Sequence, residues 1–118
     1  MNKTSKKELK KKYLSTLPPM GIYQVKNLTN GKILIGSGLN VQGKINSCKF
    51  QLENGSHMNR VLQEDYNKMV PDNFAFEIID YLKPKEDLKK DYTDDLKMLE
   101  EMWIEKLMPF GEKGYNIK

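Results

Sequence analysis

The strongest constraint on the fold is a pair of short apolar runs joined by an Asn-Gly dipeptide. Residues 21–28 and 32–37 tend to alternate between apolar and polar side chains, and Asn30-Gly31 lies between them. This dipeptide is typical of a tight hairpin turn because it accepts the positive φ angles that such a turn requires. The sequence therefore predicts two antiparallel strands connected by a hairpin turn.

Alternation along a strand also assigns each side chain to one face of the sheet. On the first strand, one face carries Tyr23, Val25 and Asn27. On the second strand, Ile33 and Ile35 point one way and Leu34 points the other way. Tyr23 and Val25 are therefore expected to lie on the same face.

The rest of the chain predicts helices around one more strand. Apolar residues recur at helical spacing in 39–53, 58–69 and about 92–107. A largely apolar run at 74–82 predicts a third strand, central in the sheet, and the closing residues 114–117 are expected to return as a short edge strand. A chain of 118 residues suits a single modest core. The predicted fold class is α+β, with a small three-stranded antiparallel sheet flanked by helices.

The net charge of +4 is concentrated at the N-terminus. Residues 1–12 contain six lysines and one glutamate, so residues 13–118 together are slightly acidic. We therefore divide the chain into a basic arm at 1–18, with a short helix at 3–15, and a folded domain at 19–118. Such a lysine run can attract a polyanion by releasing counterions, and it can equally be a solvated, frayed terminus.

Composition excludes several classes of protein. The single cysteine, Cys48, rules out an internal disulfide and fits a reducing compartment, so a cytoplasmic location is expected. One cysteine and one histidine, His57, are too few for a zinc finger. No apolar run approaches the ~20 residues that span a bilayer, so no membrane partner is expected. The only arginine is Arg60, which is unusual for a nucleic-acid enzyme because phosphate recognition commonly uses the guanidinium group.

Two half-motifs in the hairpin resemble the signature of the GIY-YIG nuclease family. They are Gly21-Ile22-Tyr23 and, after ten intervening residues, Leu34-Ile35-Gly36, with leucine in place of the second tyrosine. The resemblance continues through 52–69, 73–79 and the last helix, and covers about residues 20–117. The chain is similar to phage-encoded and intron-encoded endonuclease domains, which implies a phage or mobile-element origin and the host cytoplasm as its location.

The resemblance also implies a set of catalytic positions. The family uses two tyrosines, an arginine on the first helix, often a histidine one turn later, a glutamate on the last helix and a late asparagine. The positions that this chain retains are Tyr23, His57, Glu100 and Asn116. By this resemblance Glu100 would bind Mg²⁺ or Mn²⁺, and no other cofactor is implied.

Glu100 also stands out on physical grounds. It lies four residues after Leu96 and three before Trp103, so it projects from the apolar face of the predicted helix. A carboxylate there needs a cation, a metal ion or a proton, unless it is a boundary residue whose carboxylate reaches water.

Three positions depart from the family's pattern. Leu34 replaces the second tyrosine and has no hydroxyl group to orient or deprotonate water. Lys44 occupies the position of the helix arginine and keeps its positive charge, but it lacks the bidentate donor fork of a guanidinium group. Cys48 occupies the position of the histidine one turn later and is a poor proton shuttle. These changes remove a candidate base and weaken the phosphate clamp, which argues against efficient nuclease activity.

The same part of the chain can still hold a phosphate group. The predicted ligand-binding residues are Tyr23, Gly36, Ser37, Lys44 and His57. Gly36-Ser37-Gly38 is expected to be a glycine-rich turn whose amides bind a phosphate oxygen, and a tight strand-to-helix turn explains these residues equally well. Tyr23 can instead be a buried, hydrogen-bonded tyrosine, and His57 can instead contact the helix that follows it.

The residues support two functional hypotheses. In the first, the chain is a catalytically degenerate GIY-YIG-like domain that binds a phosphate-bearing ligand, either a nucleic acid or a small nucleotide, or a host protein. In the second, it is an active Mg²⁺- or Mn²⁺-dependent endonuclease that cleaves DNA phosphodiester bonds, and its catalytic residues are Tyr23, Lys44, His57 and Asn116. A homodimer is a further possible assembly.

Overall fold

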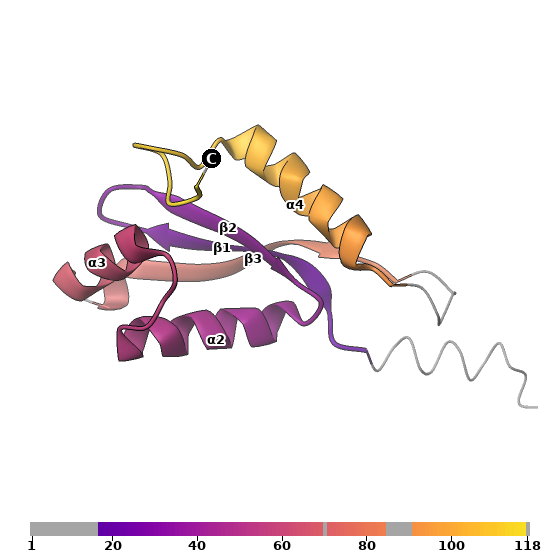
Figure 1. Cartoon of the computed structure of the whole chain (residues 1–118), viewed down its shortest axis with the longest axis horizontal. Coiled ribbons are helices and arrows are strands. Elements are labelled where there is room, and N and C mark those ends of the chain that lie inside the picture. The colour runs from indigo at the N-terminus through magenta and orange to yellow at the C-terminus, as the bar shows by residue number, and fades with distance from the viewer. Residues whose placement is uncertain (1–16, 70, 85–90, 118) are drawn as a thin grey trace, which may run out of the picture.

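A three-stranded antiparallel sheet carries helices on both faces in the computed structural model (Figure 1), which describes residues 17–69, 71–84 and 91–117. The elements are β1 Met20–Asn27, β2 Ile33–Gly38, α2 Val41–Asn54, α3 Arg60–Lys68, the short 3₁₀ helix η1 Pro71–Asn73, β3 Phe74–Leu82 and α4 Thr93–Leu107. The predicted α+β fold class and the three predicted helices are confirmed. The helix predicted at 3–15 lies outside the described residues. No helix among the described residues is long and apolar enough to cross a membrane.

The sheet has the strand order β2-β1-β3, so β1 is central. The predicted hairpin joins β1 and β2 through a turn in which Gly31 has a φ of +77°. The prediction that β3 is central was wrong. This strand lies at an edge, but helices cover parts of both its faces: Phe76 packs on the α2 side and Ile79 on the α4 side. Because both faces are partly buried, β3 reads as a continuous apolar run.

Two apolar clusters lie on opposite faces of the sheet. The first, between the sheet and helices α2 and α3, contains Val25, Cys48, Leu52, Leu62, Phe74 and Tyr115. The second, between the sheet and α4, contains Ile22, Ile35 and Leu96. Tyr23 and Leu34 pack against the first cluster and Ile33 against the second. The face assignments predicted from alternation are therefore confirmed.

Side-chain caps fix where the helices begin. The Asn40 side chain accepts a hydrogen bond from the Gly43 amide at 3.1 Å, and α2 ends at Gly55, which has a φ of +74°. The Asn59 side chain accepts one from the Leu62 amide at 3.1 Å at the start of α3. These caps satisfy backbone donors that a helix end leaves unpaired. They place Lys44 in the first turn of α2 and Arg60 at the first residue of α3.

The C-terminal segment lies against the free edge of β2. Its backbone forms a single parallel bridge, between Gly114 and Ile33, so the predicted edge strand at 114–117 is reduced to one bridge. The Asn116 side chain does the rest of the pairing: its oxygen accepts from the Ile35 amide at 2.8 Å and its nitrogen donates to the Ile35 carbonyl at 3.0 Å. A side-chain amide here replaces the peptide group of a second strand.

A buried polar network ties this segment to the rest of the domain. The fully buried Asn27 side chain donates to the Tyr115 hydroxyl at 3.0 Å and accepts from the Thr29 amide at 2.9 Å. The Tyr115 hydroxyl in turn donates to the Asp65 carboxylate of α3 at 2.7 Å. Strand β1, helix α3 and the C-terminal segment therefore meet at one tyrosine.

Candidate functional site

Two glycines on one face of β2 make room for two candidate functional side chains. Gly36 pairs with Tyr23, and a Cβ atom at Gly36 would lie 2.4 Å from Tyr23 Cζ, so the phenol ring lies across this glycine. A Cβ atom at Gly38 would lie 2.4 Å from Lys44 Cγ, so the lysine stem lies across the second glycine. Since residues 36 and 38 share a face, the Tyr23 ring and the Lys44 stem lie next to each other along β2.

Gly36, Ser37 and Gly38 do not form a turn. They pair with Tyr23, Ile22 and Gly21 as the last residues of β2. The predicted glycine-rich turn was therefore wrong, because these glycines accommodate neighbouring side chains within a strand. The role of Gly36 and Ser37 in ligand binding stays a prediction.

The surroundings of Tyr23 keep its hydroxyl group protonated. Burial first, and then the charges of Cys48 and Glu100, raise the pKa of Tyr23 to about 12. Cys48 comes from α2 and Glu100 from α4, so side chains from helices on both faces of the sheet act on this phenol. At neutral pH the Tyr23 hydroxyl is a hydrogen-bond donor and not a base.

Cys48 and His57 are in direct contact. The distance from Cys48 Sγ to His57 Nε2 is 3.4 Å. The Asn59 amide donates to His57 Nδ1 at 3.0 Å, so in the neutral ring the proton resides on Nε2 and points toward the sulfur. Burial lowers the pKa of His57 and raises the pKa of Cys48 to about 11. The pair is therefore a neutral imidazole beside a thiol, and not an activated nucleophile.

This environment predicts slow chemical modification of Cys48. Because the thiolate is the reactive form, raising the pKa of the thiol from 9.0 to about 11 lowers the thiolate fraction at pH 8 about 100-fold. We expect 5,5′-dithiobis(2-nitrobenzoic acid) to label the folded protein at least about 100-fold more slowly than the urea-unfolded protein. The labelling rate of the folded protein should keep rising with pH up to about pH 11. A rate that levels off near pH 9 would contradict this environment.

Glu100 lies on the packed side of α4. It is half-buried, whereas Glu101 and Glu105 are exposed, and its neighbours at helical spacing, Leu96 and Trp103, belong to the second cluster. Within the described part of the chain its carboxylate has no hydrogen bond or ion pair. The position predicted from the sequence, on the apolar face of the last helix, is confirmed.

A metal ion at Glu100 would have to be held largely by water and ligand. Among the described residues no group of three His, Cys, Asp or Glu side chains could hold a metal ion. Mg²⁺ tolerates such a site because it keeps several waters and often binds proteins through one or two carboxylates together with substrate phosphates. The half-buried carboxylate, which has no partner among the described residues, could therefore hold a hydrated divalent ion.

The structure places the sequence-predicted residues in different surroundings. The Tyr23 ring and the Lys44 stem lie across the two glycines at the end of β2, Glu100 on α4 raises the pKa of Tyr23 through its charge, and His57 touches the Cys48 thiol. The Asn116 side chain is engaged with Ile35, so we interpret it as a positioning residue for β2.

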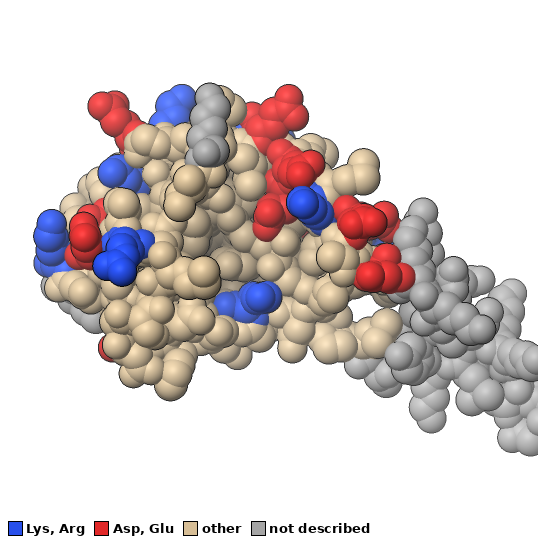
Figure 2. Space-filling model, viewed as in Figure 1, with Lys and Arg blue, Asp and Glu red and all other residues tan. Residues whose placement is uncertain are grey.

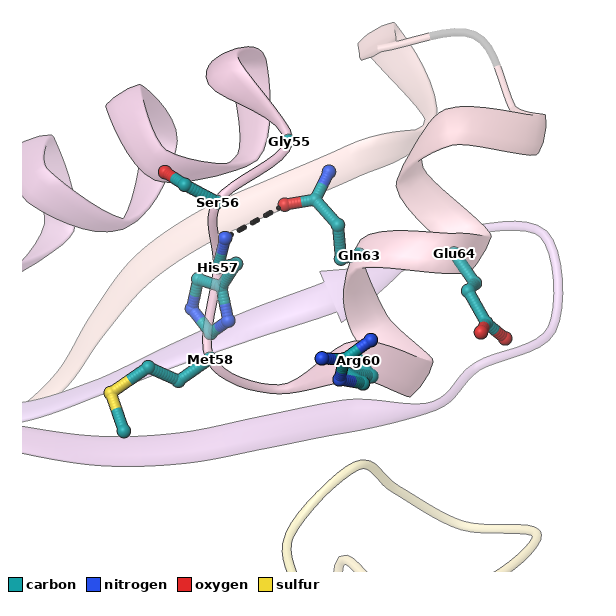
Figure 3. A pocket seen from close by; sticks show the side chains of 7 residues that line it. All are labelled: Gly55, Ser56, His57, Met58, Arg60, Gln63 and Glu64. Atoms are coloured by element: carbon teal, nitrogen blue, oxygen red, sulfur yellow. Dashed lines mark hydrogen bonds between the residues drawn. The ribbon is translucent and has the colours of Figure 1, made fainter.

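Sequence reasoning missed a buried glutamine that holds the His57 loop. The Gln63 oxygen accepts from the His57 amide at 3.0 Å (Figure 3). The Gln63 nitrogen donates to the Leu52 carbonyl at 2.9 Å. Gln63 thereby ties the loop to the last turn of α2. A polar residue within the apolar pattern of 58–69 was the signal that could have revealed it.

The charges around this site are uneven. Figure 2 shows carboxylates gathered over α4, where Asp94, Glu101 and Glu105 are exposed. This field repels a polyanion from the outer side of α4. A polyanion would therefore meet less repulsion on the side of Lys44 and the His57 loop than over α4.

No protein-family model and no curated protein matches the sequence. Two solved structures are similar to it. The structure of the catalytic domain of homing endonuclease I-TevI is 29% identical, with a TM-score of 0.69, and the match covers 84% of this chain and 98% of that chain. The catalytic domain of intron endonuclease I-TevI, in a mutant with alanine in place of one glutamate, is 28% identical, with a TM-score of 0.68 and coverage of 85% and 94%. The resemblance and the fold predicted from the two half-motifs are confirmed.

Proposed function

We propose that this chain, whose fold is that of the catalytic domain of the GIY-YIG homing endonuclease I-TevI, binds the phosphodiester backbone of a nucleic acid and cleaves it poorly or not at all. One observation carries the proposal. At the strand position diagonal to Tyr23, where a second phenol would stand, Leu34 packs its side chain against the first apolar cluster. Tyr23, with a pKa of about 12, does not supply the missing base.

The remaining groups suit binding. The Tyr23 hydroxyl can donate a hydrogen bond to a phosphate oxygen, and the Lys44 ammonium beside it can neutralise the phosphate charge. Asn116 holds the β2 backbone on which the Tyr23 ring rests. A divalent ion bound to Glu100 would supply positive charge and an acidic water molecule. These residues hold and orient a phosphate without a described side chain poised to remove a proton.

A second candidate function is a metal-dependent endonuclease. The observation that favours it is the half-buried Glu100 carboxylate, which lies close enough to raise the pKa of Tyr23. A hydrated metal ion there could activate water without a protein base. Binding of a small nucleotide or a host protein, and a homodimer, stay predictions.

Two variants of α2 test the proposed binding site. Lys44→Met removes the charge and keeps the stem that lies over Gly38, whereas Lys49→Met removes an equally exposed charge farther along the same helix. Because a hydrogen bond to a charged group contributes about 1.5–3 kcal/mol, we expect Lys44→Met to weaken DNA binding about tenfold or more. Lys49→Met should weaken it less than about threefold. Fluorescence anisotropy with labelled DNA at fixed salt measures both.

Cleavage of supercoiled plasmid with Mg²⁺ or Mn²⁺ separates the two candidate functions. Under our proposal the parent protein binds DNA and leaves the plasmid intact, or nicks it no faster than the Glu100→Ala variant does. Nicking that requires the metal ion and disappears in Glu100→Ala would establish the endonuclease instead. If neither binding nor cleavage of DNA is detected, both candidates are wrong.

A further inference from the structure

A pocket with a volume of about 430 Å³ lies beside the candidate site, between the end of α2 and the start of α3. It is lined by Gly55, Ser56, His57, Met58, Arg60, Gln63 and Glu64 (Figure 3). Its volume is within the range of small-ligand pockets. His57 lines this pocket and also contacts Cys48 in the site, so the two share a wall. The pocket is therefore close to the place where the proposed function puts a bound strand.

The pocket is lined by Arg60, the only arginine of the chain. Arg60 is exposed, and within the described part of the chain no carboxylate forms an ion pair with it. Glu64 is four residues farther along α3, a spacing at which ion pairs often form, but Figure 3 shows its side chain pointing outward from the helix. The planar donor fork of Arg60 is thus available to a ligand.

The other lining residues indicate what kind of ligand fits. Met58 is 92% exposed at the rim and presents a polarisable thioether, and the His57 ring is flat. The Gln63 side chain is already bonded to His57, Leu52 and Asn67 and serves as a wall. A bare phosphate would use the arginine alone. A nucleobase would use both features, because it has an apolar face for the thioether and a polar edge for the guanidinium group.

We propose that this pocket receives an unstacked guanine of the bound strand and that Arg60 is the specificity-determining residue. Guanine presents two adjacent acceptors, O6 and N7, that match the arginine fork, whereas thymine presents a single carbonyl on that edge. The proposal rests on the proposed binding of a nucleic-acid strand. It adds a base preference that the backbone contacts of Tyr23 and Lys44 do not provide.

The test uses the full chain and three single-stranded oligonucleotides of equal length. One is all thymidine, one carries a single central guanine, and one carries 7-deazaguanine, which lacks the N7 acceptor. Because a bidentate arginine–guanine pair discriminates by about 1–3 kcal/mol, we expect the guanine strand to bind at least about fivefold more tightly than all-thymidine. The 7-deazaguanine strand should lose most of that advantage. Fluorescence anisotropy at one salt concentration measures all three affinities.

Two variants of α3, each of which loses one positive charge, test whether Arg60 causes the guanine preference. Arg60→Gln should bind the three strands with equal affinity. Lys68→Gln, at the other end of the helix, should keep the guanine preference. If the parent binds all three strands equally, or if Arg60→Gln keeps the preference, the guanine pocket is wrong and backbone binding stands. If no strand binds, the proposed backbone binding and the proposed guanine pocket are both wrong.

Discussion

Replacing Asn27 by alanine is expected to lower the free energy of unfolding by about 2–4 kcal/mol. The side chain is fully buried, and its loss removes the hydrogen bonds to the Tyr115 hydroxyl and from the Thr29 amide. A cavity is left where the amide was, and the Thr29 amide loses its acceptor. Because Tyr115 also bonds Asp65, the change loosens the contact of β1 with both α3 and the C-terminal segment.

Urea unfolding followed by far-UV circular dichroism measures this change. Asn46→Ala is the matched control, because Asn46 is exposed on α2 and its loss should change the free energy of unfolding by less than about 0.5 kcal/mol. Tyr115→Phe removes the hydroxyl from the other side of the same bond. The loss of unfolding free energy in the double variant should therefore be at least about 0.5 kcal/mol smaller than the sum of the losses in the two single variants. An Asn27→Ala protein as stable as the parent would show that the network contributes nothing.

Asn27 also shows how much of the fold could be predicted from the sequence. Alternation placed it on the same face as Tyr23 and Val25, and the structure confirms that this face is buried. The pattern could not show that a polar residue there is satisfied, because its main partner, Tyr115, lies 88 positions away in the chain. Local patterns predict which face is buried, and long-range contacts decide how its polar groups are paired.

The same limit explains the errors in the sheet. The sequence of β3 resembles that of a central strand because periodicity reports the burial of side chains, and helices partly bury both faces of this edge strand. The closing segment reads as a strand, but its pairing with β2 runs through the Asn116 side chain. A sequence pattern does not distinguish a side-chain amide from a backbone amide as a pairing group.

At the candidate site, the sequence predicted candidate residues but not the contacts that these residues make. Gly36 and Gly38 appeared to form a turn, because nothing local shows that the Tyr23 ring and the Lys44 stem lie across them. Cys48 and His57 are nine positions apart, and only the hydrogen bond from the Asn59 amide to Nδ1 shows that the imidazole presents a proton to the sulfur. The chemical character of the pair therefore depends on a third residue.

Under the proposed function, the contacts of Leu34 and Cys48 indicate which substitutions would raise the rate of cleavage. Residue 34 is half-buried and lies on the same face as Gly36, so a tyrosine there would place its hydroxyl beside that of Tyr23. Residue 48 is different, because Cys48 is 3% exposed within the first cluster, and a histidine would overpack it. The substitutions expected to increase cleavage are therefore at residues 34 and 44, and Cys48 is kept.

We expect the double variant Leu34→Tyr/Lys44→Arg to nick supercoiled plasmid with Mg²⁺ at least about 100-fold faster than the parent, because one preorganised transition-state stabiliser contributes about 10²–10³ in rate. The matched control is Leu34→Phe/Lys44→Arg, which has the same ring without the hydroxyl group and should stay near the parent rate. Adding Glu100→Ala to the active variant should abolish the gain, because it removes the carboxylate that would bind the metal ion. Equal rates for the tyrosine and phenylalanine variants would show that the loss of the second phenol is not what limits catalysis.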